Sequence, residues 1–429
     1  MNVLNINLPN CHFRSLIELV RSGHNVYTTH IIDNKSNYES KFGIQNIREE
    51  QNSAVMDYTE SDIPELEEYS RFSVIDCVER MIEEYDIDIL QVAPPHMAFL
   101  HTHFADKMTY IGAPENVSLH EGNKLYGKEA AESLGLNVPR IIKRGNLNAP
   151  DFFDDLDIPA VIKPSAAWAA AMVIHTEDDV RVMKNNINSG VWDSSEPRDY
   201  YVEEYLQDMI ETNFYFAVAN GEYAITHTQQ IIGEDNNKRP ISSVWFDHTY
   251  MKPLDPEIDA IVRDEVHPYL QHLAGLGGRW EGSLCGAYTS EGQWYFLETN
   301  VRPDVFNSIP TFMSGDDYIK GMLEDVSLFG AAWKDINISK LFIHCDDIST
   351  PYPIHLHDKY DVLYPNNLHF IGDDYFVVDI QGFVESSTQN EKTFVRSGGT
   401  FVIDNNVPAE FIREVEESTS WKFNADPDL

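Results

Sequence analysis

The sequence is poor in basic residues. It has 31 Lys and Arg against 70 Asp and Glu, a formal net charge of −39 over 429 residues. Nucleic acids and anionic membranes are held mainly by Lys and Arg, so we expect neither as a partner. Such acidity is also typical of a salty habitat, where a carboxylate-rich surface keeps a protein in solution. A protein this acidic must concentrate its few cations to bind phosphate, so lysines in apolar surroundings become candidate ligands.

Long apolar runs and paired cysteines are missing too. The runs "AWAAAMVI" and "DILQVAPP" are shorter than a membrane span, and "MNVLNINLPN" lacks the basic-then-apolar layout of a signal peptide. The four cysteines, Cys11, Cys77, Cys285 and Cys345, lie far apart without a CxxC pair, which favours reduced thiols over a disulfide framework or a zinc site. We therefore expect a soluble, cytoplasmic protein.

The first part of the chain has a βα pattern. Residues 3–32 read as strand, helix and strand, and the amphipathic "VIDCVERMIEEY" leads into the apolar strand "DILQVAPP" and the short strand "MTYIGAP". This alternation predicts an open parallel sheet up to about residue 116. The polar segment 34–70 is expected to be an irregular insertion.

The pattern changes after residue 118. A helix over "NKLYGKEAAESLG", closed by Gly135, precedes the short buried strand "IPAVIKPS". Two hairpins with turns at "ANGE" and "TSEGQ" follow, with a helix between them. Strands and a closing helix after about residue 335 predict a small α+β module.

One strand end carries a pattern suited to a metal-bound phosphate. In "WYFLETNVRPDVF", Glu298, Asn300 and Arg302 stand at i, i+2 and i+4, so in an extended segment they share one face. Two oxygen ligands and a fixed cation then converge on one point. The alternative is an acidic strand end with a solvated arginine.

Two lysines and an alternating acidic strand accompany this pattern. Lys124 opens a helix and Lys163 ends an apolar strand, so the pair can hold successive phosphates, although a lysine at a strand end usually snorkels to solvent. "YVEEYL" places Glu203 or Glu204 on one face and leaves the backbone of residues 205 and 206 as an exposed edge. An adenine needs such an edge with a carboxylate nearby, and Glu211 is a second candidate carboxylate.

The order "EGNK", "AVIKP", "YVEEYL", "LETNVRP" resembles the ATP-grasp superfamily and, within it, phosphoribosylamine–glycine ligase, over nearly the whole chain. The resemblance implies a multidomain α/β and α+β protein with an ATP-grasp fold, an N-terminal open parallel α/β domain and a small C-terminal α+β module. The expected divisions are an N-terminal domain at 1–117, an ATP-grasp domain at 118–335 and a C-terminal module at 336–429. The ATP-grasp domain divides into a lysine and flap part, 118–200, and a hinge and metal part, 201–335.

The resemblance also implies roles for these residues. ATP phosphates would contact Lys124 and Lys163, adenosine would be held by Glu203 or Glu204, Glu211 and the hinge backbone of Tyr205 and Leu206, and Mg²⁺ or Mn²⁺ would bind Glu298 and Asn300. Arg302 would face the reacting phosphoryl group or the substrate carboxylate, and Lys163 would be the second catalytic residue. In place of the extra acidic metal ligand of many ATP-grasp enzymes, the chain has the small residues Gly286 and Ala287, as in the glycine ligase.

Substrate-facing segments depart from that family. Its glycine-rich flap is here "SAAWAAAM", within a candidate lid at 164–172, and its N-terminal glycine-rich turn is replaced by "NLPNCHFRSL", where His12 and Arg14 are the candidate stand-ins. Its glycine-rich substrate segment is replaced by "GEDNNKRPISSVWF", where Lys238 and Arg239 are the candidate anion ligands.

The expected function is that of an ATP-dependent carboxylate–amine ligase that forms an acyl phosphate and releases ADP and phosphate. The expected substrates are glycine and 5-phosphoribosylamine, as in purine biosynthesis, and the expected protein is a monomer or homodimer. The alternatives are a ligase with another amino acid or amine, a kinase, and a nucleotide-binding protein without catalysis. The pairs His101/His103 and His355/His357 are interpreted as surface histidines, because neither has an evident third metal ligand.

Overall fold

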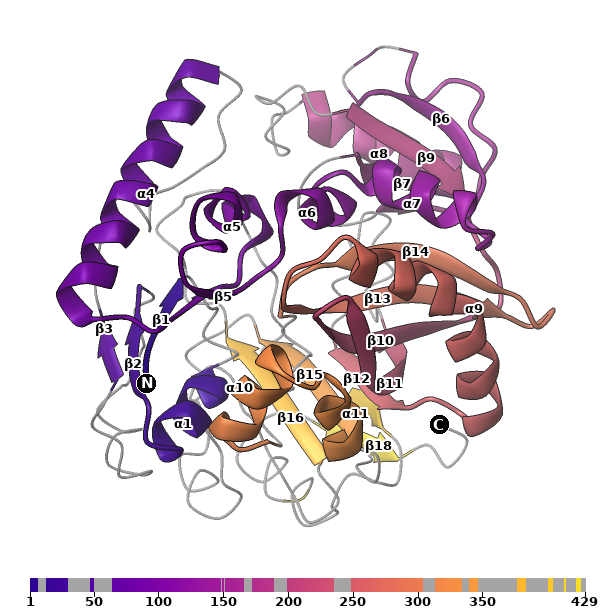
Figure 1. The fold of residues 1–429 in the computed structure, drawn as a ribbon. Coiled ribbons are helices and arrows are strands. Elements are labelled where there is room, and N and C mark those ends of the chain that lie inside the picture. Colours follow the sequence, from indigo (N-terminus) through magenta and orange to yellow (C-terminus); the bar gives the residue numbers. More distant parts are fainter. Residues whose placement is uncertain are drawn as a thin grey trace.

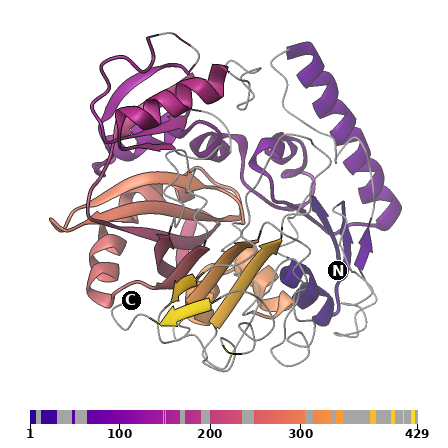
Figure 2. The same ribbon diagram turned by 180° about the vertical axis from the view of Figure 1, so that it is seen from behind.

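The computed structural model describes most of the first 333 residues and a few strands beyond them. The described residues are 1–6, 13–29, 47–49, 64–147, 149, 151–165, 172–188, 199–234, 248–303, 313–333, 339–345, 376–382, 400–403, 413 and 422–425. They form a five-stranded, a four-stranded and a seven-stranded sheet and one further strand pair, β17 (Thr400–Ile403) with β18 (Lys422–Ala425). Figures 1 and 2 show these sheets from opposite sides.

The N-terminal sheet is entirely parallel, with the order β3-β2-β1-β4-β5. This confirms the predicted open parallel sheet. Its elements are β1 (Asn2–Ile6), α1 (Phe13–Arg21), β2 (Asn25–Thr28), β3 (Ile47–Glu49), α4 (Pro64–Tyr85), β4 (Ile89–Val92), the 3-10 turn η2 (Pro95–Met97), α5 (Phe99–Phe104) and β5 (Thr109–Ile111).

Helix α4 corrects the sequence prediction, because the segment 34–70 is not irregular throughout. The helix begins at Pro64, ten residues before the apolar periodicity starts, with Glu65 and Glu67 in its first turn. Proline at the first helical position and acidic residues in the first turn both favour a helix start. This first half of α4 exposes Tyr69 and Phe72, so it lacks the buried stripe that the prediction relied on.

The four-stranded sheet, with the order β6-β9-β7-β8, carries the predicted lysine strand and hinge strand. Each neighbouring pair is antiparallel, and Lys163 of β7 lies opposite Tyr201 of β9. The elements of this region are α6 (Glu115–Gly122), α7 (Lys124–Ser133), β6 (Ile141–Asn146), β7 (Ala160–Pro164), β8 (Met172–Ile174), α8 (Glu177–Asn188) and β9 (Asp199–Glu204).

The seven-stranded sheet has the order β14-β13-β10-β11-β12-β15-β16. Both predicted hairpins are present, and the β10–β11 turn has Asn220 and Gly221 at φ 56° and 80°, as a two-residue type I′ hairpin requires. Its elements are β10 (Met209–Ala219), β11 (Glu222–Glu234), β12 (His248–Pro253), α9 (Pro256–Gly275), β13 (Trp280–Thr289), β14 (Trp294–Asn300), α10 (Gly315–Leu323), α11 (Ser327–Trp333), β15 (Ser339–Cys345) and β16 (Phe376–Gly382). The sheet thus runs across the expected division at residues 335 and 336.

The two faces of the β13–β14 hairpin have different neighbours. One face packs on α9 through Trp294, Phe296 and Leu284, which belong to a buried core with Tyr269 and Leu273. The opposite face looks toward the four-stranded sheet, and α6 and α7 lie between the two sheets against β14 (Figure 1).

A β-bulge decides which side chains of β14 reach the second face. Cys285 pairs with Glu298 but Gly286 pairs with Phe296, so Leu297 is the extra residue. Phe296 and Thr299 consequently both contact Tyr269 on the α9 side. Glu298 and Asn300 are therefore turned to the opposite face. Without the bulge, strict alternation would have placed Glu298 on the same face as Phe296.

The N-terminal sheet and the seven-stranded sheet are packed against each other. A single buried cluster joins Leu16 and Leu19 of α1, Ile319 and Met322 of α10, and Ala217 of β10. The Gly112 N–H, just after β5, also donates to the Arg279 carbonyl before β13, at 2.6 Å. Among the described helices, none is both long and apolar enough to cross a membrane.

Candidate active site

The centre of the site is a buried carboxylate held between two lysines. Glu203 Oε1 lies 2.6 Å from Lys163 Nζ, and Glu203 Oε2 lies 2.9 Å from Lys128 Nζ. All three side chains are at least nine-tenths buried. Burial alone would raise the pKa of Glu203, but the two lysines outweigh it and hold the pKa below its ordinary value.

This arrangement answers two questions that the sequence left open. Of Glu203 and Glu204, it is Glu203 that points inward, and Lys163 does not snorkel to solvent. Burial lowers the pKa of Lys128 to about 8, whereas at Lys163 the effect of burial is exceeded by that of Glu203, and the pKa rises above its ordinary value. Both lysines therefore carry charge at neutral pH.

Glu298 and Lys124 form the second ion pair of the site. Lys124 Nζ lies 2.8 Å from Glu298 Oε2, and both side chains are partly exposed. Lys124 lowers the pKa of Glu298 to about 2, against the effect of burial and together with Lys163 and Lys128. The start of α7 is also tied to the lysine strand, because the Lys124 N–H donates to the Ser165 carbonyl at 2.8 Å. The structure thus brings Lys124, Lys163 and Glu298 into one charged cluster.

Asn300 and Arg302 continue this cluster beyond the end of β14. Arg302 Nη2 donates to Asn300 Oδ1 at 3.4 Å, and Asn300 Nδ2 donates to Ser283 Oγ at 3.3 Å. Arg302 Nε donates to Glu121 Oε1, and the Val301 N–H donates to Glu121 Oε2, each at 2.7 Å. The two oxygens of Glu121 therefore fix the direction in which the guanidinium points.

The predicted adenosine residues lie at the hinge between β9 and β10. Glu204 Oε1 accepts a hydrogen bond from the Arg140 N–H at 2.8 Å, and the ring of Tyr205 contacts His175 edge-on at 5.1 Å between centroids. Leu206 follows in the non-regular segment between the strands. Glu211, inside β10, has its pKa raised to about 7 by burial and by the charge of Glu298.

Several predicted residues lie outside this description. Lys238, Arg239, His12, His355 and His357 are not among the described residues, nor is most of the candidate lid at 164–172, and no side-chain position is described for Arg14. His103 Nε2 lies 2.7 Å from Glu79 Oε1 and 2.8 Å from Lys107 Nζ. The described residues contain no group of three or more His, Cys, Asp and Glu side chains suited to a metal ion.

Two residues of the cluster were missed by the sequence reasoning. Lys128 is one helical turn after Lys124, so a 3.6-residue repeat on that helix would have placed both on one face. Glu121 lies in the quoted segment "EGNK", but only the structure shows its two oxygens meeting Val301 and Arg302. Its place in this motif could have marked Glu121 as a site residue, but nothing in the sequence indicates that its partner is Arg302.

The expected small residues Gly286 and Ala287 do lie on β13, the strand next to β14, where they pair with Phe296 and Tyr295. Cys285, and neither Gly286 nor Ala287, is the cross-strand partner of Glu298. Gly286 has another reason to be small, because a Cβ there would lie 2.0 Å from the Trp294 ring. A thiol is a poor ligand for Mg²⁺, so the cross-strand position adds no hard oxygen donor.

The remaining donors fit a magnesium ion bound together with phosphates. Glu298 offers a carboxylate and Asn300 an amide oxygen on the same face, and Mg²⁺ typically takes one or two protein oxygens with phosphates and water. Glu298 also stays ionised over the physiological range, as a metal ligand must.

Comparison with known proteins gives similarity in fold. No protein-family model and no curated protein sequence matches the chain. Among solved structures, the L-amino acid ligase from Bacillus licheniformis has a TM-score of 0.53 at 12% identity, with 75% of this chain and 73% of that chain covered. The biotin carboxylase domain of 2-oxoglutarate carboxylase from Hydrogenobacter thermophilus, solved with MgADP, ADP and bicarbonate, has a TM-score of 0.52 at 15% identity, with coverages of 78% and 69%.

Phosphoribosylamine–glycine ligase from Thermotoga maritima is also similar. Its TM-score is 0.50 at 13% identity, with 77% of this chain and 76% of that chain covered. The protein has the ATP-grasp fold, as its motifs led us to expect. At these identities the comparisons establish the fold, and the chemistry has to be argued from the site.

Proposed function

We propose that the protein is an ATP-dependent carboxylate–amine ligase that works through an acyl phosphate and releases ADP and phosphate. The observation that carries this proposal is the meeting of Lys124, Lys163 and Glu298, with Asn300 beside them, in a chain with the ATP-grasp fold. A carboxylate cannot acylate an amine directly, because oxide is too poor a leaving group. Transfer of the γ-phosphoryl group of ATP to the carboxylate gives an acyl phosphate, whose leaving group is phosphate and no longer oxide.

The lysines supply the positive charge for this transfer. Lys124 and Lys163 hold the ATP phosphates as point charges, and Lys163 counters the charge that builds up on the moving phosphoryl group. Glu203 keeps Lys163 and Lys128 in place through its two ion pairs. Its contacts favour this positioning role over a direct contact with adenosine.

Glu298 and Asn300 would hold Mg²⁺, which when bound neutralises negative charge on the phosphate oxygens. Arg302, fixed by Glu121, points its guanidinium toward Asn300 and so toward the reacting groups. Adenosine binds at the hinge, where Glu204, Glu211 and the backbone of Tyr205 and Leu206 offer hydrogen-bonding groups. The candidate lid at 164–172 would exclude water from the acyl phosphate.

The first substrate pair we propose is glycine with 5-phosphoribosylamine, as in purine biosynthesis. The motif order along the chain supports it, together with the fold shared with a phosphoribosylamine–glycine ligase. The second pair is another amino acid with another amine. The replaced N-terminal turn and the segment with Lys238 and Arg239 favour this second pair, because those segments face the substrates in that family. We propose a cytoplasmic monomer or homodimer. We also propose domain divisions at residues 117 and 335, with the C-terminal module contributing β15 and β16 to the sheet of the ATP-grasp domain.

Nucleotide binding is the first test. ATP or a non-hydrolysable analogue with Mg²⁺ should raise the melting temperature, because a ligand at a hundredfold excess over its Kd stabilises the native state by about 2.7 kcal/mol. Lys163→Met should abolish most of this shift. Lys184→Met, which removes an exposed lysine of α8 paired with Asp154, is the matched control and should leave the shift intact. Absence of any shift in the wild type would overturn the nucleotide site.

Turnover is the second test. ADP release should be measured over a matrix of amino acids and amines, with phosphoribosylamine generated in place, and products identified by mass spectrometry. Glycinamide ribonucleotide would establish the first pair, and another amide would establish the second. Nucleotide binding without turnover for any pair would favour a nucleotide-binding protein without catalysis, and a stable phosphorylated product would indicate a kinase.

A further inference from the structure

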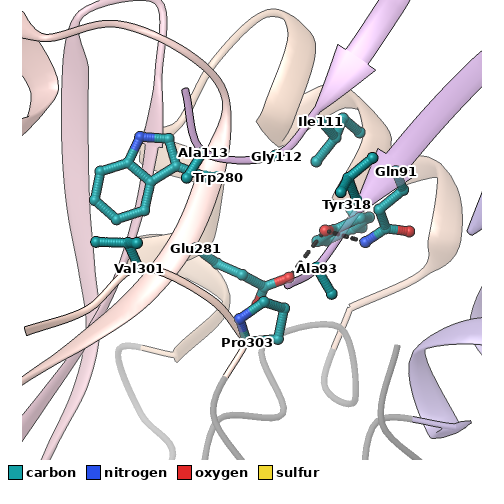
Figure 3. A pocket seen from close by; sticks show the side chains of 11 residues that line it. Gln91, Ala93, Ile111, Gly112, Ala113, Trp280, Glu281, Val301, Pro303 and Tyr318 are labelled. Carbon is teal, nitrogen blue, oxygen red and sulfur yellow. Dashed lines mark hydrogen bonds between the residues drawn. The ribbon is translucent and has the colours of Figure 1, made fainter. Parts of the chain in front are cut away.

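A second polar site lies where the N-terminal sheet meets the β13–β14 hairpin. A small pocket there is lined by Gln91 and Ile111 from the carboxyl ends of β4 and β5, by Glu281 at the start of β13, by Pro303 after β14, and by Tyr318 of α10. Figure 3 shows Glu281, Tyr318 and Gln91 pointing toward one another. The carboxyl ends of strands in an open α/β sheet are where ligands commonly bind.

Glu281 is the unusual member of this group. Its side chain is buried, with 4% of the residue exposed. Oε1 accepts a hydrogen bond from the Tyr318 hydroxyl at 3.0 Å, whereas buried Oε2 has no hydrogen-bond partner among the described residues. No lysine, arginine or histidine of the described part of the chain forms an ion pair with it. A buried carboxylate normally needs such a partner.

The neighbours of Glu281 are held by one another. Gln91 Nε2 donates to the Tyr318 hydroxyl at 3.0 Å, and Gln91 Oε1 accepts from Asn5 Nδ2 at 3.1 Å. The Tyr318 hydroxyl thus has a donor on one side and its acceptor, Glu281, on the other. This chain of bonds holds Oε1 in place and leaves Oε2 as the acceptor open to a ligand.

The place of Glu281 on its strand relates it to the phosphate site. Ser283, two residues further along β13, pairs with Asn300 and hydrogen-bonds to it. Because side chains two residues apart share a face, Glu281 lies on the same face as Asn300, roughly 7 Å further along the strand. That separation is within the reach of one small substrate molecule.

Size and charge select the group that completes the pocket. The space available accepts a group about the size of one water molecule. A metal ion would need about six oxygen ligands where one carboxylate oxygen is available. The remaining walls include the apolar side chains of Ala113, Val301 and Pro303. A primary ammonium group has the size and the charge that these walls and the open oxygen require.

We propose that Glu281 binds the ammonium group of an amino acid whose carboxylate is phosphorylated next to Asn300. This inference rests on the proposed ligase function and adds to it a recognition residue for the acyl donor. The ammonium of the acyl donor fits better than that of the amine acceptor. A carboxylate partner keeps an amine protonated, and a protonated amine has no lone pair with which to attack an acyl phosphate.

The test compares amino acids with their 2-hydroxy acids, which keep the carboxylate and lose the ammonium. Calorimetry with a non-hydrolysable ATP analogue and Mg²⁺ should first identify the amino acid that binds most tightly. The wild type should bind it more tightly than its 2-hydroxy acid. Glu281→Gln, which keeps an acceptor for Tyr318, should weaken amino acid binding roughly ten- to a hundredfold and leave the 2-hydroxy acid unchanged.

Two controls keep the outcomes separate. Glu265→Gln alters a half-buried carboxylate on α9, away from the pocket, and should leave the preference for the amino acid intact. Methylammonium chloride, an ammonium without a carboxylate, tests whether the pocket binds the amine acceptor and not the amino acid. If methylammonium binds in a Glu281-dependent way while amino acids do not, the acyl-donor assignment is overturned. Equal binding of amino and hydroxy acids by an enzyme that binds the ATP analogue would overturn the ammonium site alone. Failure to bind the analogue would overturn the ligase proposal itself.

Discussion

Glu203 and Glu281 are buried to nearly the same depth but have opposite acid–base behaviour. They are 2% and 4% exposed. Two lysines hold the pKa of Glu203 below its ordinary value, whereas burial raises the pKa of Glu281 to about 7, with only the Tyr318 hydroxyl opposing it. Depth alone therefore does not decide whether a carboxylate in this protein is charged. The cations within reach of it decide.

The distribution of cations makes this difference informative. The whole chain has 31 Lys and Arg, yet Lys124, Lys128 and Lys163 all lie next to the two carboxylates Glu203 and Glu298. Such concentration in an acidic protein is expected where phosphates bind. At Glu281 the described part of the chain offers no cation, which is expected where the cation arrives with the ligand.

The largest expected effect is on turnover, from removal of a charge on the cation-rich side. Glu298→Gln should lower kcat by at least about 100-fold, because in the proposed site the lost charge would hold Mg²⁺, and it pairs with Lys124 where negative charge would develop. Steady-state ADP release at saturating Mg²⁺ would measure this. Nucleotide affinity should largely persist, since the proposed adenosine site lies at the hinge and not on β14. Near wild-type turnover would mean that β14 is not the metal strand.

The next effect is on folding stability and separates the two carboxylates directly. Glu203→Gln should lower the free energy of unfolding by about 3–5 kcal/mol, because it leaves two buried lysines without their shared counter-charge. Glu281→Gln, an identical change at similar depth, should not destabilise the protein at pH 8, where it removes an uncompensated charge. Urea denaturation of both variants measures the difference. Equal losses would contradict the role given to the lysines.

A smaller effect distinguishes the carboxylates through pH. Because the folded pKa of Glu281, about 7, exceeds its ordinary value of 4.5, the protonated group stabilises the fold at low pH. That stabilisation is lost as the pH rises from about 4.5 through 7. Between pH 5 and 8, the free energy of unfolding of the wild type minus that of Glu281→Gln should fall by about 2–3 kcal/mol. A pH-independent difference would show that Glu281 does not titrate in this range.

Much of the fold was predictable, because its elements have strong local signals. The parallel N-terminal sheet follows from alternating strands and helices, and the β10–β11 hairpin follows from Asn220-Gly221. The start of α4 was missed, since its first half has no buried stripe to create a periodic pattern. The continuation of the seven-stranded sheet into β15 and β16 was also missed, because pairing between distant segments leaves no local trace.

The arrangement of the candidate site was predictable where it depends on residue type and spacing along one strand. Glu298 and Asn300 were expected on one face and do lie on one face, although simple alternation is broken at Leu297 and the bulge itself was not foreseen. Partners from distant segments were out of reach: Glu203 meets Lys128 across 75 positions of sequence, and Glu281 meets Tyr318 across 37. The role of Glu281 in particular depends on a missing partner, which a sequence cannot display.

The smallest expected effect on folding stability comes from a carboxylate that is paired with a cation but exposed to solvent. Glu129 Oε1 lies 3.1 Å from Arg144 Nη2, with 58% and 52% of the two side chains exposed. Solvent screens such a pair, and holding two long side chains together costs entropy, so Glu129→Gln should change the free energy of unfolding by less than about 1 kcal/mol. Urea denaturation alongside Glu203→Gln measures it. If Glu129→Gln destabilised the protein as much as Glu203→Gln, pairing with a cation would matter regardless of burial. Burial would then not be what separates Glu203 from Glu281. The lack of a cation partner at Glu281 would no longer be evidence for a ligand, since any unpaired carboxylate in the chain would show the same stability effect.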